Sequence, residues 1–301
     1  MAFLRSRSEC LISAIIPAHN EAGVIADTLR SLLQGHEPGA VRVLVVCNGC
    51  SDSTADVARS VAGVTVVESP IPSKVAAVNL GLETAPEGIA ICVDADIRLS
   101  PGGLAALAAA INVPEPRVAA PAVRMDFGSG TTWSVRAYYR LWLSLPYVAE
   151  GMVGCGVYAL NRAARQRLGK IPQIIADDGY VRGSFAPAER VKVDGVTATV
   201  RAPRTMRDLV KIKTRSRLGR YQLDSMFGGK LPGQNERHQH ATAWRGVLRN
   251  PVRWVDVAVY LYVNTVTRYR AKRQFAKLET YVWERDESTR PKQVTPGTLT
   301  S

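Results

Sequence analysis

Residues 88–97 read Gly-Ile-Ala-Ile-Cys-Val-Asp-Ala-Asp-Ile, an apolar run that ends in two acidic residues. Turn-forming residues lie on both sides, Pro86 before the run and Ser100-Pro101-Gly102-Gly103 after it, so the run is predicted to be a buried strand. Side chains alternate along a strand, and Asp94 and Asp96 are therefore expected to point the same way at its carboxyl end. Two carboxylates on one face repel each other unless a cation lies between them, and Mg²⁺ or Mn²⁺ prefers oxygen ligands. A solvated acidic turn is the alternative, but open α/β sheets bind ligands at this edge, which favours a metal site.

The first hundred residues alternate between strand patterns and helix patterns. Strands are predicted from apolar runs at residues 11–17, 41–47, 64–68 and 89–93. Helices are predicted between them, at residues 21–33, 53–61 and 73–84. Further elements are predicted as helices at 101–111, 133–147, 175–184 and 205–227, and as strands at 118–125, within 151–161 and, as an edge strand, at 191–200. The alternation predicts an α/β fold with a doubly wound, mostly parallel sheet flanked by helices, followed by C-terminal helices.

The net charge of +13 is confined to the last third of the 301 residues. Residues 1–200 carry 18 Lys and Arg against 18 Asp and Glu, whereas residues 201–301 carry 21 against 8. A neutral body with a basic last third predicts an anionic partner such as phosphates, an anionic membrane face or nucleic acid. A solubilising surface is the alternative.

The five cysteines are an odd number, and several lie in or beside apolar strand-like runs. This pattern is typical of free thiols in a reducing compartment, and the expected location is the cytoplasm. Cys47 and Cys50 have Cys-x-x-Cys spacing, but the chain has no second pair of ligands to complete a zinc site. The first apolar run is too short for a membrane span and lacks a cleavage site, so no signal peptide is expected.

Residues 254–269 form the most apolar part of the basic third. The segment is lined by Trp and Tyr, is flanked by Arg and Lys, and has an uncharged run too short to span a bilayer. A helix lying in a membrane interface and a helix packed against the rest of the protein are equally compatible with it. The preceding polar stretch, 228–246, is expected to be a loop in which His238 and His240 are solvated, and the tail after residue 286 is expected to be disordered.

Four further motifs accompany the Asp-x-Asp pair. They are Ile15-Ile16-Pro17-Ala18-His19-Asn20-Glu21 after the first strand, Val45-Val46-Cys47-Asn48-Gly49-Cys50-Ser51-Asp52-Ser53-Thr54 after the second, Lys74-Val75-Ala76-Ala77-Val78-Asn79-Leu80-Gly81-Leu82 at the start of a helix, and Asp177-Asp178. In this order and spacing the motifs resemble those of the family-2 glycosyltransferases with the GT-A fold, over roughly residues 11–225. The resemblance divides the chain into a GT-A domain (1–228), a loop with a basic and aromatic helical region that is a candidate membrane-interface element (229–285), and a tail (286–301).

The resemblance implies transfer of a sugar from a nucleotide-diphosphate sugar with inversion of the anomeric centre, assisted by Mg²⁺ or Mn²⁺. It implies that the nucleoside is held by Pro17, His19, Glu21, Asn48 and Asp52. Lys74 is then expected near the diphosphate or base, Asp94 at the ribose or metal, and Asp96 as a metal ligand. The many relatives that recognise uracil use an Asp where this chain has Cys47, which argues against a uridine donor.

The resemblance also makes Asp178 the catalytic base and places Arg217 and Arg220, in Arg-Leu-Gly-Arg-Tyr, near the leaving diphosphate. These residue types fit the chemistry, because a carboxylate can take the acceptor's proton while Arg side chains stabilise the departing negative charge. The alternatives are a helix N-cap for Asp177-Asp178 and a solvated helix face for the arginines.

The expected acceptor is a glycan or a lipid-linked saccharide, as in polysaccharide or glycolipid biosynthesis. Enzymes with the Arg-x-x-Arg-Tyr element that polymerise sugars carry several membrane spans, so single additions are expected here. A helix in the interface would place the protein at the cytoplasmic face of a membrane. A nucleotidyltransferase that makes nucleotide sugars is an alternative, but it normally has a Gly-rich loop where this chain has Ala18-His19-Asn20-Glu21-Ala22. No nucleic-acid partner is expected, because the aromatic residues do not interleave with the basic ones.

Overall fold

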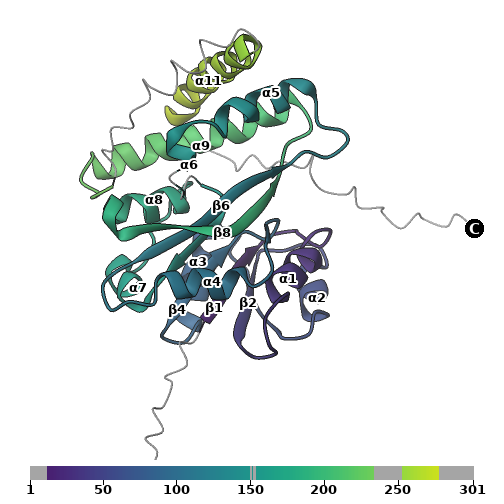
Figure 1. The fold of residues 1–301 in the computed structure, drawn as a ribbon, viewed down its shortest axis with the longest axis vertical. Coiled ribbons are helices and arrows are strands. Elements are labelled where there is room, and N and C mark those ends of the chain that lie inside the picture. The colour runs from purple at the N-terminus through teal and green to yellow at the C-terminus, as the bar shows by residue number, and fades with distance from the viewer. Residues whose placement is uncertain (1–11, 150, 152–153, 234–252, 278–301) are drawn as a thin grey trace, which may run out of the picture.

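An eight-stranded mixed sheet lies at the centre of the protein (Figure 1). The structure is a computed structural model that describes residues 12–149, 151, 154–233 and 253–277. Its strands are β1 (Ile12–Ala18), β2 (Val41–Asn48), β3 (Val64–Ser69), β4 (Ile89–Val93), β5 (Arg98–Leu99), β6 (Val118–Asp126), β7 (Val157–Leu160) and β8 (Arg190–Arg201). Its helices are α1 (Ile25–Leu33), α2 (Thr54–Arg59), α3 (Lys74–Thr84), α4 (Gly103–Ala110), α5 (Trp133–Trp142), α6 (Pro146–Ala149), α7 (Arg162–Leu168), α8 (Asp177–Ser184), α9 (Met206–Phe227) and α11 (Trp254–Phe275), with a 3₁₀ turn at Pro187–Glu189.

The strand order is β3-β2-β1-β4-β7-β6-β8-β5, and the sheet is mostly parallel as expected. β3, β2, β1 and β4 are paired in parallel, while β7 runs antiparallel to both β4 and β6, and β5 antiparallel to β8. In the register of β1 and β4, Ile15 pairs with Cys92, so β4 ends at Val93 while β1 continues in the same direction to Ala18. The segments that follow β1 and β4 therefore meet at one edge of the sheet.

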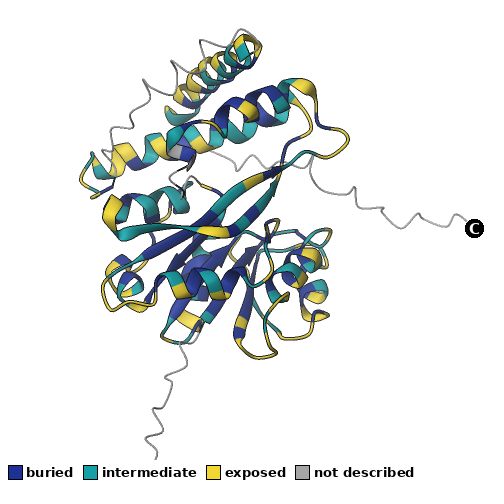
Figure 2. Ribbon diagram, viewed as in Figure 1, coloured by how far each residue is buried: buried dark blue, intermediate teal, exposed yellow. Residues whose placement is uncertain are grey.

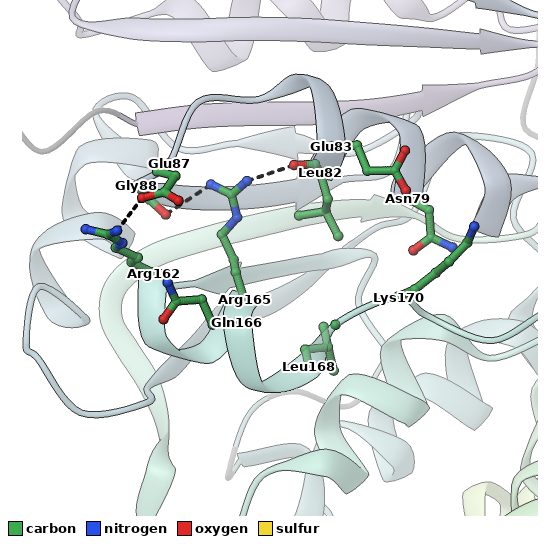
Figure 3. Close-up of a pocket in the computed structure, with 11 residues that line it drawn as sticks. Asn79, Leu82, Glu83, Glu87, Gly88, Arg162, Arg165, Gln166, Leu168 and Lys170 are labelled. Carbon is green, nitrogen blue, oxygen red and sulfur yellow. Dashed lines mark hydrogen bonds and ion pairs between the residues drawn. The ribbon is translucent and has the colours of Figure 1, made fainter.

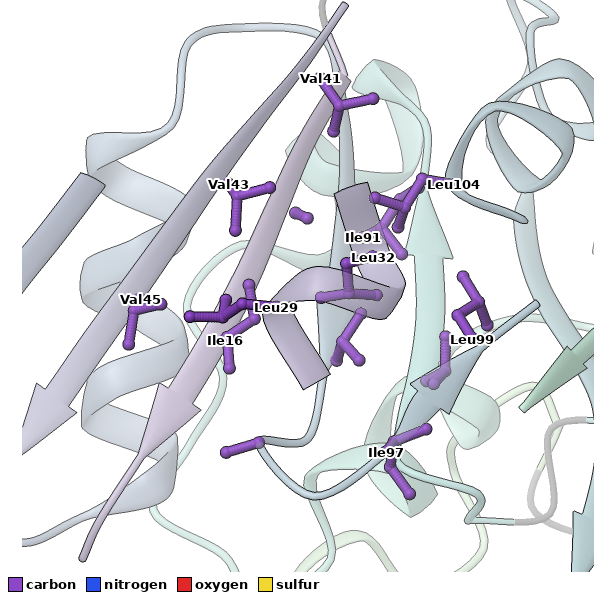
Figure 4. Packing of buried hydrophobic residues seen from close by; sticks show 14 of the residues in the cluster. Ile16, Leu29, Leu32, Val41, Val43, Val45, Ile91, Ile97, Leu99 and Leu104 are labelled. Atoms are coloured by element: carbon purple, nitrogen blue, oxygen red, sulfur yellow. The ribbon is translucent and has the colours of Figure 1, made fainter. Parts of the chain in front are cut away.

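Alternation along the strands gives the sheet an apolar core on each face. Ile16 points into a cluster with Leu29 of α1 and Leu104 of α4 (Figure 4), whereas its neighbour Ile15 packs on the opposite face with Val75 of α3. Because helices cover both faces, the central strands β1, β2, β4 and β7 are buried on both sides, as Figure 2 shows, whereas β3 and much of β8 are partly exposed.

A second layer of helices, α5, α9 and α11, lies beyond the ends of β6 and β8 (Figure 1). α11 packs on α5 through a stacked pair of rings, Tyr138 and Tyr260, with centroids 5.4 Å apart. Arg140 of α5 also donates two hydrogen bonds to Asp256, at 3.0 and 2.6 Å. The apolar segment at residues 254–269 therefore packs against the rest of the protein, which is one of the two arrangements that its sequence allowed. None of the described helices combines the length and the apolar character that a membrane crossing requires.

Several predicted elements differ in detail. α1 begins at Ile25 rather than at residue 21, and β8 is not the edge strand, because β5 pairs with it over two residues. The short elements β5 and α7 were not predicted. The start of the chain, His238 with His240, and the tail from residue 286 lie outside the described residues.

Candidate active site

The Asp-x-Asp pair lies in a tight turn immediately after β4. The strand ends at Val93, and the Ile97 amide donates to the Asp94 carbonyl at 3.1 Å, closing the turn. The alternation of a strand therefore does not set the directions of the two carboxylates, contrary to the sequence argument. Asp94 is half-buried and Asp96 is exposed.

Lys74 connects Asp94 to the start of α8. It is the first residue of α3, and its ammonium lies 2.7 Å from Asp94 Oδ1 and 3.0 Å from Asp177 Oδ1. Burial alone would lower the pKa of Lys74, but the carboxylates of Asp177 and Asp94 outweigh it and raise that pKa above its usual range. The lysine therefore stays charged and holds two carboxylates together that are far apart in the sequence.

Asp177 and Asp178 occupy the first turn of α8 but do not cap it. The N-cap residue is Ala176, and no side chain makes a capping hydrogen bond. Asp177 is buried and accepts a hydrogen bond from the Tyr158 hydroxyl at 3.4 Å, whereas Asp178 Oδ1 accepts from the Gly179 amide at 2.7 Å. Burial, followed by the negative charge of Asp177, raises the pKa of Asp178 to about 6. Burial also raises the pKa of Asp94, so Asp178 is a candidate, rather than the sole candidate, for proton exchange near neutral pH.

Two glycines leave space for these carboxylates. Gly154 and Gly156 both have positive φ, at 74° and 71°. A Cβ at Gly154 would lie 2.6 Å from Asp178 Oδ2, and a Cβ at Gly156 would lie 2.5 Å from Asp94 Oδ2. The segment before β7 therefore lies against both Asp94 and Asp178. The sequence analysis assigned no function to this segment. Its Gly-Cys-Gly pattern, directly before a strand, could have indicated one.

The loops after β1 and β2 are bound tightly to each other. His19 Nδ1 lies 2.6 Å from the Asn48 carbonyl, and the Ser51 amide donates to Asn20 Oδ1 at 2.7 Å. Asp52 accepts hydrogen bonds from the amides of Ala22 and Thr54, at 3.2 and 3.0 Å. Its carboxylate is thus engaged in joining the loops.

The remaining residues predicted in this region line the same edge. Pro17 pairs with Val46 near the end of β1, and Glu21 is buried where its amide donates to Thr54 Oγ1 at 2.7 Å. The structure therefore brings His19, Glu21, Asn48 and Asp52 together at the edge of the sheet where β4 also ends.

The two predicted arginines lie on α9, apart from this group. Arg220 is exposed, and Arg217 Nη2 donates to Asn264 Oδ1 of α11 at 2.6 Å. Between them, Gly219 lies against Ala176, where an added Cβ would come within 2.7 Å of the Ala176 Cβ. The Ile175 amide also donates to Gln222 Oε1 at 2.8 Å. α9 is therefore anchored beside the start of α8, which carries Asp178.

The residues after β4 fit a divalent cation. Asp94 and Asp96 supply the oxygen donors that Mg²⁺ and Mn²⁺ prefer, and the missing side chain at Gly156 keeps the space beside Asp94 Oδ2 clear. Within the described ranges, no three His, Cys, Asp or Glu side chains are grouped to hold a metal ion. Mg²⁺ is commonly held by one or two carboxylates together with substrate phosphates, and a pair of carboxylates is compatible with that arrangement.

A separate pocket of about 250 Å³ lies between the end of α3 and α7 (Figure 3). There Arg165 donates hydrogen bonds to the carbonyls of Leu82, Ala85, Pro86 and Gly88, and so closes the C-terminal end of α3. The pocket is at the amino end of β4 and includes none of the predicted site residues, so its arginine stabilises the fold.

The sheet, with acidic residues after β4 and at the start of α8, is that of a GT-A glycosyltransferase. The sequence model described as glycosyl transferase family 2 matches residues 13–168, and the chain belongs to this family. The protein is therefore a glycosyltransferase. A comparison with curated protein sequences gave no match.

Solved structures share the fold at low sequence identity. A mannosyltransferase from Pyrobaculum calidifontis in complex with GDP-Man and Mn²⁺ has a TM-score of 0.56 at 18% identity, covering 90% of this chain and 76% of that one. Mannosyl-3-phosphoglycerate synthase from Rubrobacter xylanophilus has 0.52 at 20%, covering 73% and 75%. Glucosyl-3-phosphoglycerate synthase from Mycobacterium tuberculosis, in complex with phosphoglyceric acid, has 0.50 at 24%, covering 72% and 80%.

Proposed function

We propose that the protein transfers a sugar from a nucleotide-diphosphate sugar to an acceptor hydroxyl by a single displacement that inverts the anomeric centre. The observation that carries the proposal is that Asp94 and Asp178 both lie against the segment Gly154–Gly156, which supports a donor-side carboxylate and a base beside the same segment. The joined loops of His19 and Asn48, at the same edge of the sheet as Asp94, support binding of the nucleoside beside them.

In the proposed reaction the acceptor oxygen attacks the anomeric carbon while its proton passes to Asp178. The bond from that carbon to the diphosphate oxygen breaks, and the diphosphate leaves with the electron pair. Asp94 and Asp96 would hold Mg²⁺ or Mn²⁺, which supplies positive charge to the leaving diphosphate. Lys74 keeps Asp94 and Asp177 in place, and Arg217 and Arg220 would add cationic groups from α9.

Residue Cys47 bears on the choice of donor. It is buried at the end of β2, and burial, with a contribution from Cys50, raises the pKa of its thiol to about 12. A neutral thiol does not offer the carboxylate that a uracil-binding relative has at this position. We therefore propose a donor whose base is not uracil. The mannosyltransferase that was crystallised with GDP-Man has the same fold and a donor with a different base, guanine.

The experiment is an assay of the purified protein with a panel of nucleotide sugars, with and without Mn²⁺ or Mg²⁺, measuring hydrolysis and transfer. We expect one donor to be consumed only with metal, and Asp96→Ala to abolish turnover in a folded protein. We expect Asp178→Asn to bind the donor normally and to lose about 10²–10⁴-fold in kcat. A smaller loss is expected for Asp177→Asn, and full activity in EDTA or in Asp178→Asn would refute the mechanism.

A further inference from the structure

α11 has one face packed against the protein and one face directed outward. Val263, Thr267 and Ala271 are buried on the inner face, toward α5 and α9. The outer face is exposed along the helix and consists of Trp254, Val255, Ala258, Leu261, Tyr262, Thr265, Arg268, Tyr269, Lys272 and Arg273. These positions recur every three or four residues, so they form one continuous stripe.

Large apolar side chains are concentrated on this outer face. Of the nine that are exposed among the described residues, five lie on α11: Trp254, Val255, Leu261, Tyr262 and Tyr269. Each of these five is more than half exposed. Scattered exposed apolar residues need no explanation, but a group on one helix face marks an interaction surface.

The charge of the outer face has one sign. Arg268, Lys272 and Arg273 follow the apolar half of the helix, and the Arg273 guanidinium lies 5.5 Å from the Tyr269 ring centroid. The single acid of α11, Asp256, is buried and paired with Arg140 on the inner side. The outer face therefore presents an apolar half and a cationic half without a carboxylate.

We propose that this outer face docks on an anionic lipid surface, with its apolar half in the headgroup boundary and its basic half against lipid phosphates. The helix is about 33 Å long, which suits it to lie along a surface. Trp and Tyr are the side chains favoured at the boundary between lipid and water. Protein interfaces are also enriched in Trp, Tyr and Arg, so the choice of lipid rests on the uniform positive charge of this face and is decided by the vesicle test below.

The docking face is connected to the candidate active site through α9. Asn264 and Phe275 of α11 contact Arg217 and Tyr221 of α9, and Gly219 of α9 lies on Ala176 before Asp178. This step rests on the proposed function. If the docking face binds a lipid surface, the acceptor that reaches the active site is a membrane-embedded or lipid-linked molecule.

The test is co-sedimentation with vesicles of phosphatidylcholine alone and of phosphatidylcholine mixed with phosphatidylglycerol in equal parts. We expect binding to the anionic vesicles only. Arg268→Gln with Lys272→Gln should weaken it about thirtyfold at low salt and less at high salt. Leu261→Ser with Tyr262→Ser should weaken it about tenfold or more at either salt concentration.

Matched variants elsewhere separate docking from general surface effects. Arg42→Gln with Lys170→Gln removes two exposed charges, and Val113→Ser with Met226→Ser removes two exposed apolar side chains, so both pairs should bind vesicles like the wild type. All variants should keep the wild-type rate of donor hydrolysis in solution. Absence of hydrolysis in the wild type would count against the proposed function alone, whatever the vesicles show.

Three results would overturn the docking proposal. The first is equal binding, or no binding, of the wild type to both kinds of vesicle. The second is equal weakening by the control pairs. The third is self-association in sedimentation velocity that is lost in the Leu261→Ser, Tyr262→Ser variant without any vesicle binding, which would make the face an interface between copies of the chain.

Discussion

At the scale of single residues, the proposed site depends on Lys74, because its ammonium is shared by Asp94 and Asp177. The sequence motifs identified Lys74, Asp94 and Asp178 as candidates. They did not reveal that Lys74 joins β4 to α8, since its two partners are separated by more than eighty positions and a local pattern carries no such information. The Gly154 and Gly156 pattern was visible before a strand, but the sequence could not show which carboxylates lie beside it.

The raised pKa of Asp178 predicts the pH dependence of turnover. Burial and the charge of Asp177 raise this pKa to about 6, so the carboxylate needed as a base is lost as the pH falls through about 6. Below that pH the value of kcat/KM should fall by about tenfold per pH unit. The residual activity of Asp178→Asn should lack this acidic limb, and a limb that persists in the variant would assign the titration to another group.

A side chain at Gly156 should disrupt the donor side of the site. Gly156→Ala would place a Cβ 2.5 Å from Asp94 Oδ2, so we expect donor and Mn²⁺ to bind at least tenfold more weakly by calorimetry. Gly63→Ala is the matched control, because Gly63 also has positive φ, at 83°, but has nothing within 4 Å of an added Cβ. Equal effects of the two variants would indicate backbone strain alone.

At the scale of elements, the apolar runs predicted β1, β2, β3 and β4 to within a residue or two, because buried parallel strands are continuous apolar segments. β5 was missed because two residues carry no periodicity. α1 begins later than its pattern suggested, since the amides of Glu21 and Ala22 are held by Thr54, the first residue of α2, and by Asp52 in the loop before it. Tertiary hydrogen bonds thus moved a boundary that helix periodicity alone placed at residue 21.

The contact between α9 and α8 predicts an unusual result for a helix glycine. Gly219→Ala should favour the helix by about 1 kcal/mol in isolation. In the protein its Cβ would come within 2.7 Å of the Ala176 Cβ, and α9 would have to move away from the turn that carries Asp178. We expect a loss of kcat of at least tenfold with the helix content unchanged by circular dichroism. Ser216→Ala, at an exposed position of α9, should leave kcat unaltered.

At the scale of the whole molecule, the packing of α11 on α5 was one of two interpretations that the sequence left open. Hydrophobic spacing does not say what a helix packs against, and the deciding contacts come from Tyr138 and Arg140, more than a hundred residues earlier. The outer face supports the other interpretation as well, because a helix can pack on one side and dock on the other.

The ion pair between Arg140 and Asp256 predicts how firmly α11 is held. Arg140→Ala would leave the Asp256 carboxylate, which is 4% exposed, without its arginine, and should lower the free energy of unfolding by about 1–3 kcal/mol. Adding Asp256→Asn should restore part of the loss, since it removes the unpaired buried charge. Thermal unfolding of both variants measures this, and an unchanged midpoint in Arg140→Ala would show that the pair contributes nothing.

The hydrogen bond from Arg217 of α9 to Asn264 of α11 links α9 to the helix that carries the docking face. This contact gives a physical route by which lipid bound at α11 and nucleotide bound beside α9 can influence each other. Any factor by which vesicles change the affinity for nucleotide must equal the factor by which nucleotide changes the affinity for vesicles. We expect that common factor to exceed one in the wild type and to approach one in Asn264→Ala, so that a lipid surface acts as an effector of the enzyme as well as its location.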